Sequence, residues 1–340
     1  MTIGNIMTMA QSALQAAQTQ VQVTSNNVSN VNTAGYARKS VIQQQLVAGG
    51  VGGGVSVKGV QNAADQYLQQ ASYTATAQSG QAQAVSGMLD RAQSLFGDPT
   101  SPNSFFANLD GVYAAFSTAS DTPSSSLLRQ SAVNAVSTFL DSAKGLAGSI
   151  GQLQSQAGQQ IGADVTTANG LLQQISKLNG AITQANLSGG DATGSQDQQT
   201  LLLTQLSGLI GVNVTTNGTG GVTVRSAQGV YLAGDMGPAV LAFSQSGAAG
   251  ALTATPPHGG PQAIDPGGGD IGGQFQLSQV ELPQISAQLG EYVSQAVNQL
   301  NQASNASTAV PAPTSLTGQA MGMALSTAVG GFAGKTTIAV

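Results

Sequence analysis

The 340-residue sequence contains no cysteine, so neither disulfide bonds nor thiolate-bound metals can contribute to its fold. Charged side chains are also scarce, at 7% of residues, and aromatic side chains make up only 4%. The polarity therefore comes mainly from Gln, Asn, Ser and Thr, which predicts a neutral, hydrogen-bonding surface. The length allows roughly two or three domains with a substantial buried core.

The small number of basic residues argues against a nucleic-acid partner. The 9 Lys and Arg residues are scattered along a chain of net charge −5, whereas phosphate binding requires clustered positive charge. No apolar run approaches the roughly 20 residues that cross a bilayer, so we expect no membrane contact. The first basic residue is Arg38, so the opening lacks the basic flank of a cleavable secretory signal.

Apolar residues near the N-terminus recur at alternating spacings of four and three, which is the pattern of a heptad helix. Thr24 places a polar side chain at one of these positions. An isolated helix with this pattern leaves its apolar stripe in water and needs a partner, although an ordinary amphipathic core helix has the same periodicity. The stripe consists of Ile3, Met7, Ala10, Leu14, Ala17, Val21 and Val28.

The pattern changes after this helix. The run from Ser29 to Tyr36 contains poor helix formers and a glycine, which predicts a helix end and a loop. Over residues 38–60, apolar and polar residues then alternate on both sides of the tract Gly49–Gly54. This pattern predicts a hairpin of two short strands with the tract as its turn.

Helical spacing returns in the next part of the chain, over residues 63–96, 105–117 and 123–185. Proline-containing breaks at 98–102 and 120–123 separate these segments, and we place Pro123 in the first turn of the third. The length of the third segment without internal proline predicts a rod-like helical hairpin or bundle.

A smaller β-rich unit follows a helix predicted over 201–209. Valines alternate between Asn-Gly and Gln-Gly turns over about 211–255, which indicates short strands. A further helix is predicted from Gly273 to about Ser304, with Pro283 in or near its first turn. The expected fold class is therefore mainly α with a smaller inserted β-rich domain, combining an N-terminal heptad helix, a β-hairpin and a long helical bundle or rod.

The residues that could support catalysis or metal binding are isolated. His258 is the only histidine and lies in a Pro/Gly loop, where a solvated side chain is the better interpretation. No Gly-Lys-Ser/Thr follows the tract Gly49–Gly54, so it is not a phosphate-binding loop. Asp265, Asp270 and Glu281 lack the spacing of a calcium loop. We therefore predict no catalytic residue, no cofactor and no metal.

The segment 26–36, NNVSNVNTAGY in one-letter code, directly follows the heptad helix and resembles the signature of flagellar rod, hook and hook-associated proteins. Gly53–Val57 and Asp65–Leu68 are similar to the next block of that family, with Asn62 where a basic residue is common. The motif residues are Asn26, Asn27, Asn30, Thr33, Gly35 and Tyr36.

Among the members of that family, the middle of the chain looks like the hook-associated proteins of the hook-filament junction. The similar segments include Phe105–Leu109, Arg129-Gln130, the passage 198–212 and the helix 282–298. The resemblance covers most of residues 1–305 and is strongest in the first 70.

This resemblance implies a structural subunit of the bacterial flagellum, located outside the cell, and not an enzyme. It implies export through the flagellar type III apparatus and folding of the N-terminus on packing against neighbours. The implied partners are copies of itself, the hook protein, a neighbouring hook-associated protein and an export chaperone. The stripe of the heptad helix, from Ile3 to Val28, is then the assembly interface.

The resemblance also suggests how the chain divides into domains. We expect a tube-forming heptad helix at 1–35, a hairpin linker at 36–60, a discontinuous helical domain at 61–210 plus 273–305, an outer β-rich insertion at 211–272 and a further segment at 306–340. The family has a second, C-terminal heptad helix, and none is predicted after Ser304. We therefore expect either that the chain is truncated or that the helix that packs on the N-terminal heptad helix comes from a neighbouring subunit.

Two alternatives remain beside this interpretation. A hook or rod protein would share the first motifs, but the long helical segment from Pro123 disfavours it. A secreted surface adhesin would account for the Gly, Ser, Thr and Asn content, but not for the motif at 26–36 or the absence of a signal sequence.

Overall fold

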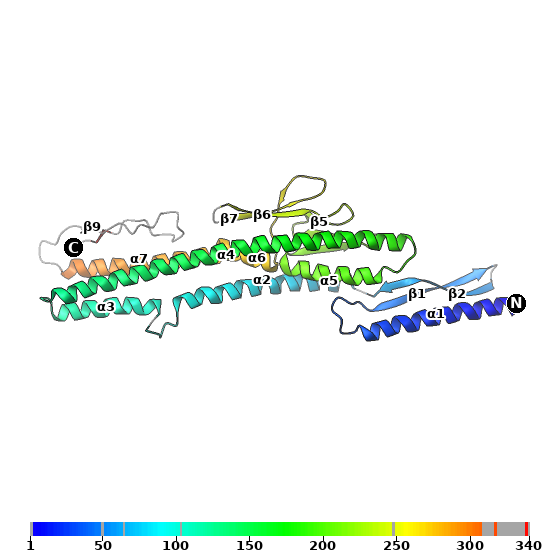
Figure 1. Ribbon diagram of the computed structural model, residues 1–340, viewed down its shortest axis with the longest axis horizontal. Helices are drawn as coiled ribbons and strands as arrows, with labels where there is room; N and C mark the ends of the chain where they lie inside the picture. Colours follow the sequence, from blue (N-terminus) through cyan, green and yellow to red (C-terminus); the bar gives the residue numbers. More distant parts are fainter. Residues whose placement is uncertain are drawn as a thin grey trace. The chain divides into compact units, whose positions relative to one another are not determined.

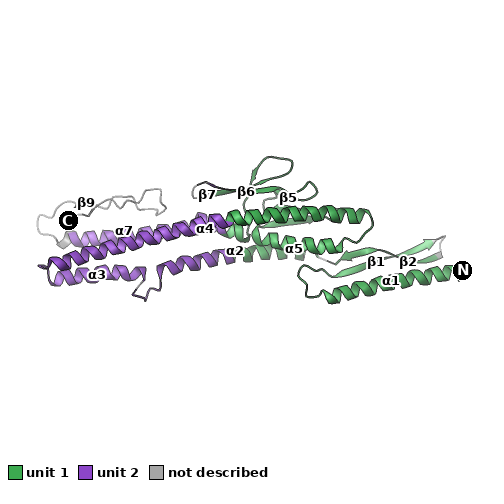
Figure 2. Cartoon of the chain, in the orientation of Figure 1, with its two compact units in different colours: residues 1–82, 161–244, 250–273 green, residues 83–160, 245–249, 274–340 purple. Residues whose placement is uncertain are grey.

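The computed structural model describes residues 3–48, 51–63, 65–102, 104–246 and 249–307, together with residues 316–317 and 337–338 (Figure 1). The chain forms two compact units, and each combines segments that are distant in the sequence (Figure 2). Unit 1 contains residues 1–82, 161–244 and 250–273, and unit 2 contains residues 83–160, 245–249 and 274–340.

The described residues are mainly helical with a smaller β-rich part, which confirms the predicted fold class. The helices are α1 (Ile3–Ser29), α2 (Gln66–Phe96), α3 (Phe105–Asp121), α4 (Ser126–Leu187), α5 (Thr193–Leu209), α6 (Gly269–Gln276) and α7 (Leu282–Ser307), with a π-helical turn, η1 (Leu277–Glu281), between the last two. The strands are β1 (Lys39–Ala48), β2 (Val51–Asn62), β3 (Val212–Thr216), β4 (Val222–Ser226), β5 (Tyr231–Ala233), β6 (Val240–Ser246), β7 (Ala249–Thr255), β8 (Gln262–Ala263), β9 (Leu316–Thr317) and β10 (Thr337–Ile338).

In unit 1, α1 lies along the antiparallel hairpin of β1 and β2 (Figure 1). The close approach depends on Gly54, which has a φ of +114° and whose added Cβ would lie 2.3 Å from Ser12 Oγ. Ser12 Oγ in turn accepts a hydrogen bond from the Val55 backbone N at 3.2 Å. The tract predicted as a turn therefore contributes Gly52–Gly54 to strand β2, where small residues let the helix approach the backbone.

The β-rich part of unit 1 consists of two three-stranded sheets, with strand orders β3-β4-β5 and β6-β7-β8. Its inward positions join the helices of the same unit in an apolar core. Fully buried members of this core include Ile182, Leu206, Ile210, Val224 and Leu232.

Amide side chains of the helices bind the strands through paired hydrogen bonds. Asn179 of α4 donates to Val222 O at 2.7 Å and accepts from Val222 N at 2.8 Å. Asn169 of the same helix binds Leu241 O and N in the same way, both at 2.8 Å. A primary amide presents one donor and one acceptor side by side, so it can replace a neighbouring strand residue. These contacts attach the β-rich part to its helices without charged groups.

Unit 2 has an aromatic core between its helices. The rings of Phe105 and Phe139 stack with centroids 5.6 Å apart, and the Tyr292 ring lies 5.8 Å from Phe105. Val112 and Phe139 are completely buried. Burial of each such side chain contributes about 1.5–3 kcal/mol, so this cluster accounts for much of the stability of unit 2.

The π turn before α7 results from a proline. Leu282 N donates to Leu277 O, five residues back, and Pro283 has no N–H to donate. The carbonyl of Ser278 would otherwise lose its helical donor, and Gln154 Nε2 of α4 donates to it at 2.8 Å. The helix thus continues through the proline because a side chain replaces the missing bond.

Several predicted element limits differ from the structure. Pro123 lies in a turn rather than in the first turn of a helix, and α4 begins at Ser126. Ser125 Oγ accepts from Leu128 N at 3.4 Å, so a serine rather than the proline caps this helix. α5 begins at Thr193, eight residues before the predicted start, because polar side chains conceal its first two turns. The helix predicted from Gly273 begins at Gly269 as α6.

The predicted strand at Lys335–Val340 is seen only at Thr337 and Ile338, which pair with Thr317 and Leu316. The expectation about a C-terminal heptad helix concerns residues outside the described part of the chain. The proposed domain boundaries remain predictions.

Candidate functional site

The apolar stripe predicted on the N-terminal helix is exposed. All seven of its residues lie on the surface of α1, and the five large side chains, from Ile3 to Val28, are 61–84% exposed. Such a continuous apolar surface on a helix indicates a binding partner, since water contact with apolar area is unfavourable.

The hairpin covers the other side of α1. Ala16 and Val23 are buried, with 4% and 5% of their surface exposed, in the helix that contacts β1 and β2. Successive helical residues are rotated by about 100°, so Leu14 and Ala16 point to nearly opposite sides. The apolar stripe therefore keeps its full surface for another partner after the hairpin has packed.

The motif at the end of α1 fixes this helix to the hairpin. Asn27 Nδ2 donates to Lys39 O at 2.9 Å, and Asn27 Oδ1 accepts from Lys39 N at 2.8 Å. The hydroxyl of Tyr36 also donates to Asn27 Oδ1, at 2.9 Å. One asparagine thus holds the first residue of β1 and the last residue of the motif together.

The remaining motif residues shape the turn between α1 and β1. Asn30 Nδ2 donates to Asn26 O at 3.0 Å, and Thr33 Oγ1 donates to Asn30 Oδ1 at 3.2 Å. The backbone N of Thr33 donates to Asn30 O at 2.9 Å, and Tyr36 N donates to Thr33 O at 3.2 Å. The side chains of Asn27, Asn30, Thr33 and Tyr36 therefore take part in these contacts, and Asn26 contributes its backbone carbonyl.

Gly35 has the conformation and space that only glycine tolerates well. Its φ is +79°, and an added Cβ would lie 3.1 Å from Leu201 Cβ and 3.3 Å from Asp197 O. The motif turn therefore packs directly against α5, and this contact joins the N-terminal arm, residues 3–62, to the rest of unit 1.

Asp197 is the main polar anchor of that contact. Its Oδ2 lies 2.9 Å from Lys39 Nζ, and its Oδ1 accepts from Ala37 N at 3.3 Å and from Asn62 Nδ2 at 3.3 Å. Lys39 Nζ also lies 5.0 Å from the centre of the Tyr36 ring. The side chains of Lys39 and Asp197 are only 13% and 15% exposed, which strengthens their attraction.

The contacts of several of these residues could not be predicted from the sequence. Asp197 lies 160 residues from Ala37, and its spacing to other acids follows no motif. Ser12 is one polar residue among many on its helix. Asn62 was the exception, because it stands where the family commonly has a basic residue, and it binds Asp197 in this chain.

No metal-binding cluster is seen in the described ranges. They contain no group of three or more His, Cys, Asp or Glu side chains that could hold a metal ion. His258 lies exposed in a turn. None of the described helices combines the length and apolar character needed to span a bilayer.

Comparison with known families gives two matches. Residues 89–319 match the family described as "Flagellar hook-associated protein FlgK helical domain". Residues 7–36, which cover α1 and the motif, match the family described as "Flagella basal body rod protein".

Curated relatives have the same description. The "Flagellar hook-associated protein 1" of Escherichia coli strain K12 is 27% identical over 237 residues, which are 68% of this chain and 43% of that protein. The protein of the same name from Bacillus subtilis strain 168 is 25% identical over 232 residues, 65% of this chain and 46% of that protein. The chain thus spans less than half the length of these relatives.

A solved structure has the same fold. It is that of the flagellar hook junction protein FlgK from Burkholderia pseudomallei, and it matches with a TM-score of 0.60 and 21% identity over 75% of this chain and 49% of that one. The helical-domain match extends over more than half of the sequence, which confirms the resemblance. The chain belongs to the FlgK family of flagellar hook-associated proteins.

Proposed function

We propose that this chain is a structural subunit at the junction between the flagellar hook and filament, and that it has no catalytic role. The observation that carries the proposal is the exposed stripe of α1, held in place by the family motif. The names of the relatives and of the protein with the similar solved structure support the location. The rod-protein match covers only residues 7–36, so it does not favour a rod subunit.

In this proposal, α1 forms the assembly interface. Its seven stripe residues pack against helices of neighbouring subunits, which removes their apolar surface from water. The hairpin and the motif fix the direction of the helix, so that the stripe faces a neighbour rather than the body of its own chain. The heptad helix then belongs to the tube-forming part at 1–35.

Export through the flagellar type III apparatus is consistent with the physical character of this arm. Helix α1 has 27 residues, with no acidic side chain in its first turn and no basic side chain in its last turn. Such a helix depends on packing for its stability in water. Such a segment can travel unfolded with an export chaperone and fold when it packs at the growing tip. The absence of cysteine removes any need for oxidative folding after export.

The remaining domains supply lateral contacts in this proposal. The helical domain at 61–210 plus 273–305 and the β-rich insertion at 211–272 form the outer part of the junction. Their partners are further copies of the chain, the hook protein and a neighbouring hook-associated protein. Recognition there rests on shape complementarity and hydrogen bonds, in keeping with the low charge of the chain.

A complementation experiment tests the proposal. The gene is deleted, and either this 340-residue form or a form of the relatives' full length is restored. We expect flagellin to be shed into the medium by the deletion strain and to be retained on hooks after restoration of a functional form. Retention only with the longer form would support the role and place an essential part elsewhere. Normal filaments in the deletion strain would refute the junction role.

A further inference from the structure

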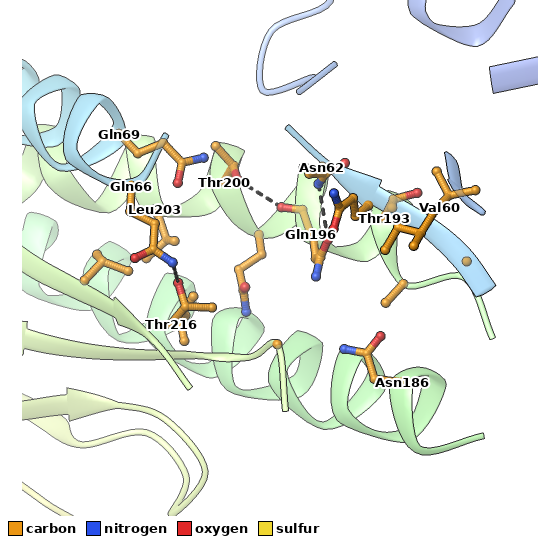
Figure 3. A pocket seen from close by; sticks show the side chains of 18 of the residues that line it. Val60, Asn62, Gln66, Gln69, Asn186, Thr193, Gln196, Thr200, Leu203 and Thr216 are labelled. Carbon is orange, nitrogen blue, oxygen red and sulfur yellow. Dashed lines mark hydrogen bonds between the residues drawn. The ribbon is translucent and has the colours of Figure 1, made fainter. Parts of the chain in front are cut away.

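Unit 1 contains a cavity of about 430 Å³ beside the base of the hairpin (Figure 3). Its walls come from β2, the first turns of α2, the end of α4 with the loop that follows it, helix α5 and the strands β3 and β4. Figure 3 shows side chains from several of these elements around one hollow, among them Asn62, Gln66, Gln69, Thr193 and Gln196. Among the described lining residues, Lys58 is the only charged one, and the other polar groups are mainly the neutral amides and hydroxyls of Gln, Asn and Thr. Such groups bind neutral hydrogen-bonding ligands.

The edge of β2 faces this cavity. Five consecutive residues of the strand, 58–62, line it, whereas β1 contributes only Ile42. Successive side chains of a strand point to opposite faces. A cavity against one face would be lined by alternate residues, so a continuous run indicates contact along the edge.

The register of the hairpin shows which backbone groups point outward at this edge. Ala63 N donates to Arg38 O at 2.7 Å, and the pairs that follow are Lys39 with Asn62 and Val41 with Val60. Antiparallel pairs alternate between hydrogen-bonded and non-hydrogen-bonded. Val60 and Asn62 therefore belong to non-hydrogen-bonded pairs, and their N–H and C=O groups point away from β1.

The chain closes comparable edges elsewhere with amide side chains. On β1, both outward groups of Lys39 are bound by Asn27. On β3, Gln70 Nε2 donates to Val212 O at 2.9 Å, and Gln70 Oε1 accepts from Val214 N at 3.0 Å. At the edge of β2, by contrast, no described residue is seen to bind the outward N–H and C=O groups of Val60 and Asn62. The side-chain oxygen Oδ1 of Asn62 is also buried without a hydrogen-bond partner in the part of the chain that the structure describes.

We propose that this cavity binds an extended, uncharged polypeptide segment, which adds as a third strand to the edge of β2 at Val60 and Asn62. A two-stranded hairpin is marginally stable alone, and a further strand would stabilise it. The stretch from Val60 to Asn62 matches about three residues of an incoming strand at roughly 3.3 Å per residue.

The cavity chemistry favours a peptide over the other neutral ligand class, a saccharide. Saccharides bind to exposed aromatic faces, and the aromatic residue in the lining, Tyr73, is only 4% exposed. Primary amides and an open strand edge are instead the groups that bind a peptide backbone. The proposal is independent of the junction role, because it rests on this edge and not on the stripe of α1.

Amide hydrogen exchange, followed by NMR on the whole chain, tests the proposal. The probe is the hexapeptide acetyl-Thr-Val-Ser-Val-Thr-Gln-amide, and its control is the same peptide with alternate backbone nitrogens methylated. We expect the probe to slow exchange of the Val60 and Asn62 amides by about tenfold or more. The Gln61 amide, which points toward Ser40, should change little. Exchange that is equally fast with and without the probe would overturn the proposal.

A pair of proline variants sharpens the test. Val60→Pro removes one outward N–H at the proposed edge, and we expect it to weaken peptide binding at least about fivefold. Val41→Pro removes an outward N–H from the opposite edge, and we expect it to leave the affinity unchanged. Equal effects of the two variants would contradict the proposal. If either variant fails to fold by circular dichroism, the exchange result on the parent chain decides.

Two further outcomes identify the occupant. Protection of Val60 and Asn62 that rises with protein concentration without peptide would support strand addition and name a second copy of the chain as its source. Protection by maltotriose but not by the peptide would overturn the proposal in favour of a saccharide site.

Discussion

Asn27 pairs with Lys39 as a residue of an adjacent strand would, with Nδ2 donating to Lys39 O at 2.9 Å and Oδ1 accepting from Lys39 N at 2.8 Å. The helix end and the strand start are thereby held by a side chain twelve residues away in sequence. Asn169 and Asn179 bind single strand residues in the same way. Gln70 bridges two residues of β3, with Nε2 donating to Val212 O and Oε1 accepting from Val214 N. A chain with few charges thus uses amides where many proteins use ion pairs.

Asn27→Ala should destabilise the N-terminal arm. The change removes both bonds to Lys39 and the acceptor of the Tyr36 hydroxyl, and we expect a cost of about 2–3 kcal/mol. The measurement is the opening free energy of β1 from amide hydrogen exchange. Asn26→Ala is the matched control, since Asn26 contributes its backbone carbonyl, and it should change that free energy by less than about 0.5 kcal/mol. Equal losses in both variants would contradict the pairing.

Gly35→Ala should cost more than Gly189→Ala. Both glycines have positive φ, +79° and +72°, so both variants carry a strain of about 1–2 kcal/mol. Only Gly35 also faces close neighbours, Leu201 and Asp197, whereas an added Cβ at Gly189 meets nothing within 4 Å. Urea unfolding of the two variants gives the difference. A smaller effect at Gly35 would show that the motif turn does not press against α5.

Lys39 and Asp197 should show energetic coupling. Their charges are 2.9 Å apart with little solvent exposure, and removal of either one leaves the other poorly solvated. We expect a coupling free energy of about 1–3 kcal/mol in a double-mutant cycle of Lys39→Met and Asp197→Asn. The value should fall only slightly between low and high salt, because buried pairs are weakly screened. Additive effects of the two changes would sink this expectation.

Leu14→Asp and Ala16→Asp should separate assembly from folding. Leu14 is 61% exposed, so its change should alter stability by less than about 1 kcal/mol and yet abolish incorporation into flagella. Ala16 is buried, so its change should destabilise the arm by about 2–4 kcal/mol. Circular dichroism, hydrogen exchange and complementation measure these effects. Normal incorporation of Leu14→Asp would remove the stripe from the assembly interface.

Stability should decline at high pH through Tyr73. Burial raises the pKa of this hydroxyl above its ordinary value of 10.0, and a hydrogen bond with Thr200 partly offsets the rise. The folded chain therefore keeps this proton to higher pH than the unfolded chain does. Below pH 10 the group adds no pH dependence, and above it the unfolded chain ionises first, so stability falls.

Tyr73→Phe provides the check on that decline. The variant lacks the ionising group, so its urea midpoint should fall less steeply between pH 10 and about 11.5 than that of the parent. An identical decline in both proteins would show that Tyr73 is not responsible.

Much of the fold could be predicted from periodicity, because the apolar residues of long helices repeat regularly. The heptad pattern from Ile3 to Val28 predicted α1 and an exposed stripe. The start of α5 was missed, since the polar residues from Thr193 to Thr200 hide the helical period. Pro123 was placed in a helix because proline is common there, but Ser125 provides the cap.

The candidate site could be predicted only in part. The motif identified Asn27 and Tyr36, whose contacts are local in sequence. Their anchor, Asp197, comes from α5, and no spacing rule connects residues so far apart. The outward-facing edge of β2 could not be predicted either. It depends on the register of the hairpin and on which strand edges are bound by side chains from elsewhere in the chain.

The amide pairs also make this fold sensitive to deamidation. Spontaneous hydrolysis turns an asparagine into an aspartate, and Asn and Gln are among the residues that heat damages most readily. At Asn179, the product would place a carboxylate oxygen against Val222 O, where Nδ2 now donates. Repulsion would replace a hydrogen bond, and the β-rich part would loosen from α4. Each such hydrolysis also adds one negative charge to a chain of net charge −5, so damaged molecules should have a lower isoelectric point than intact ones.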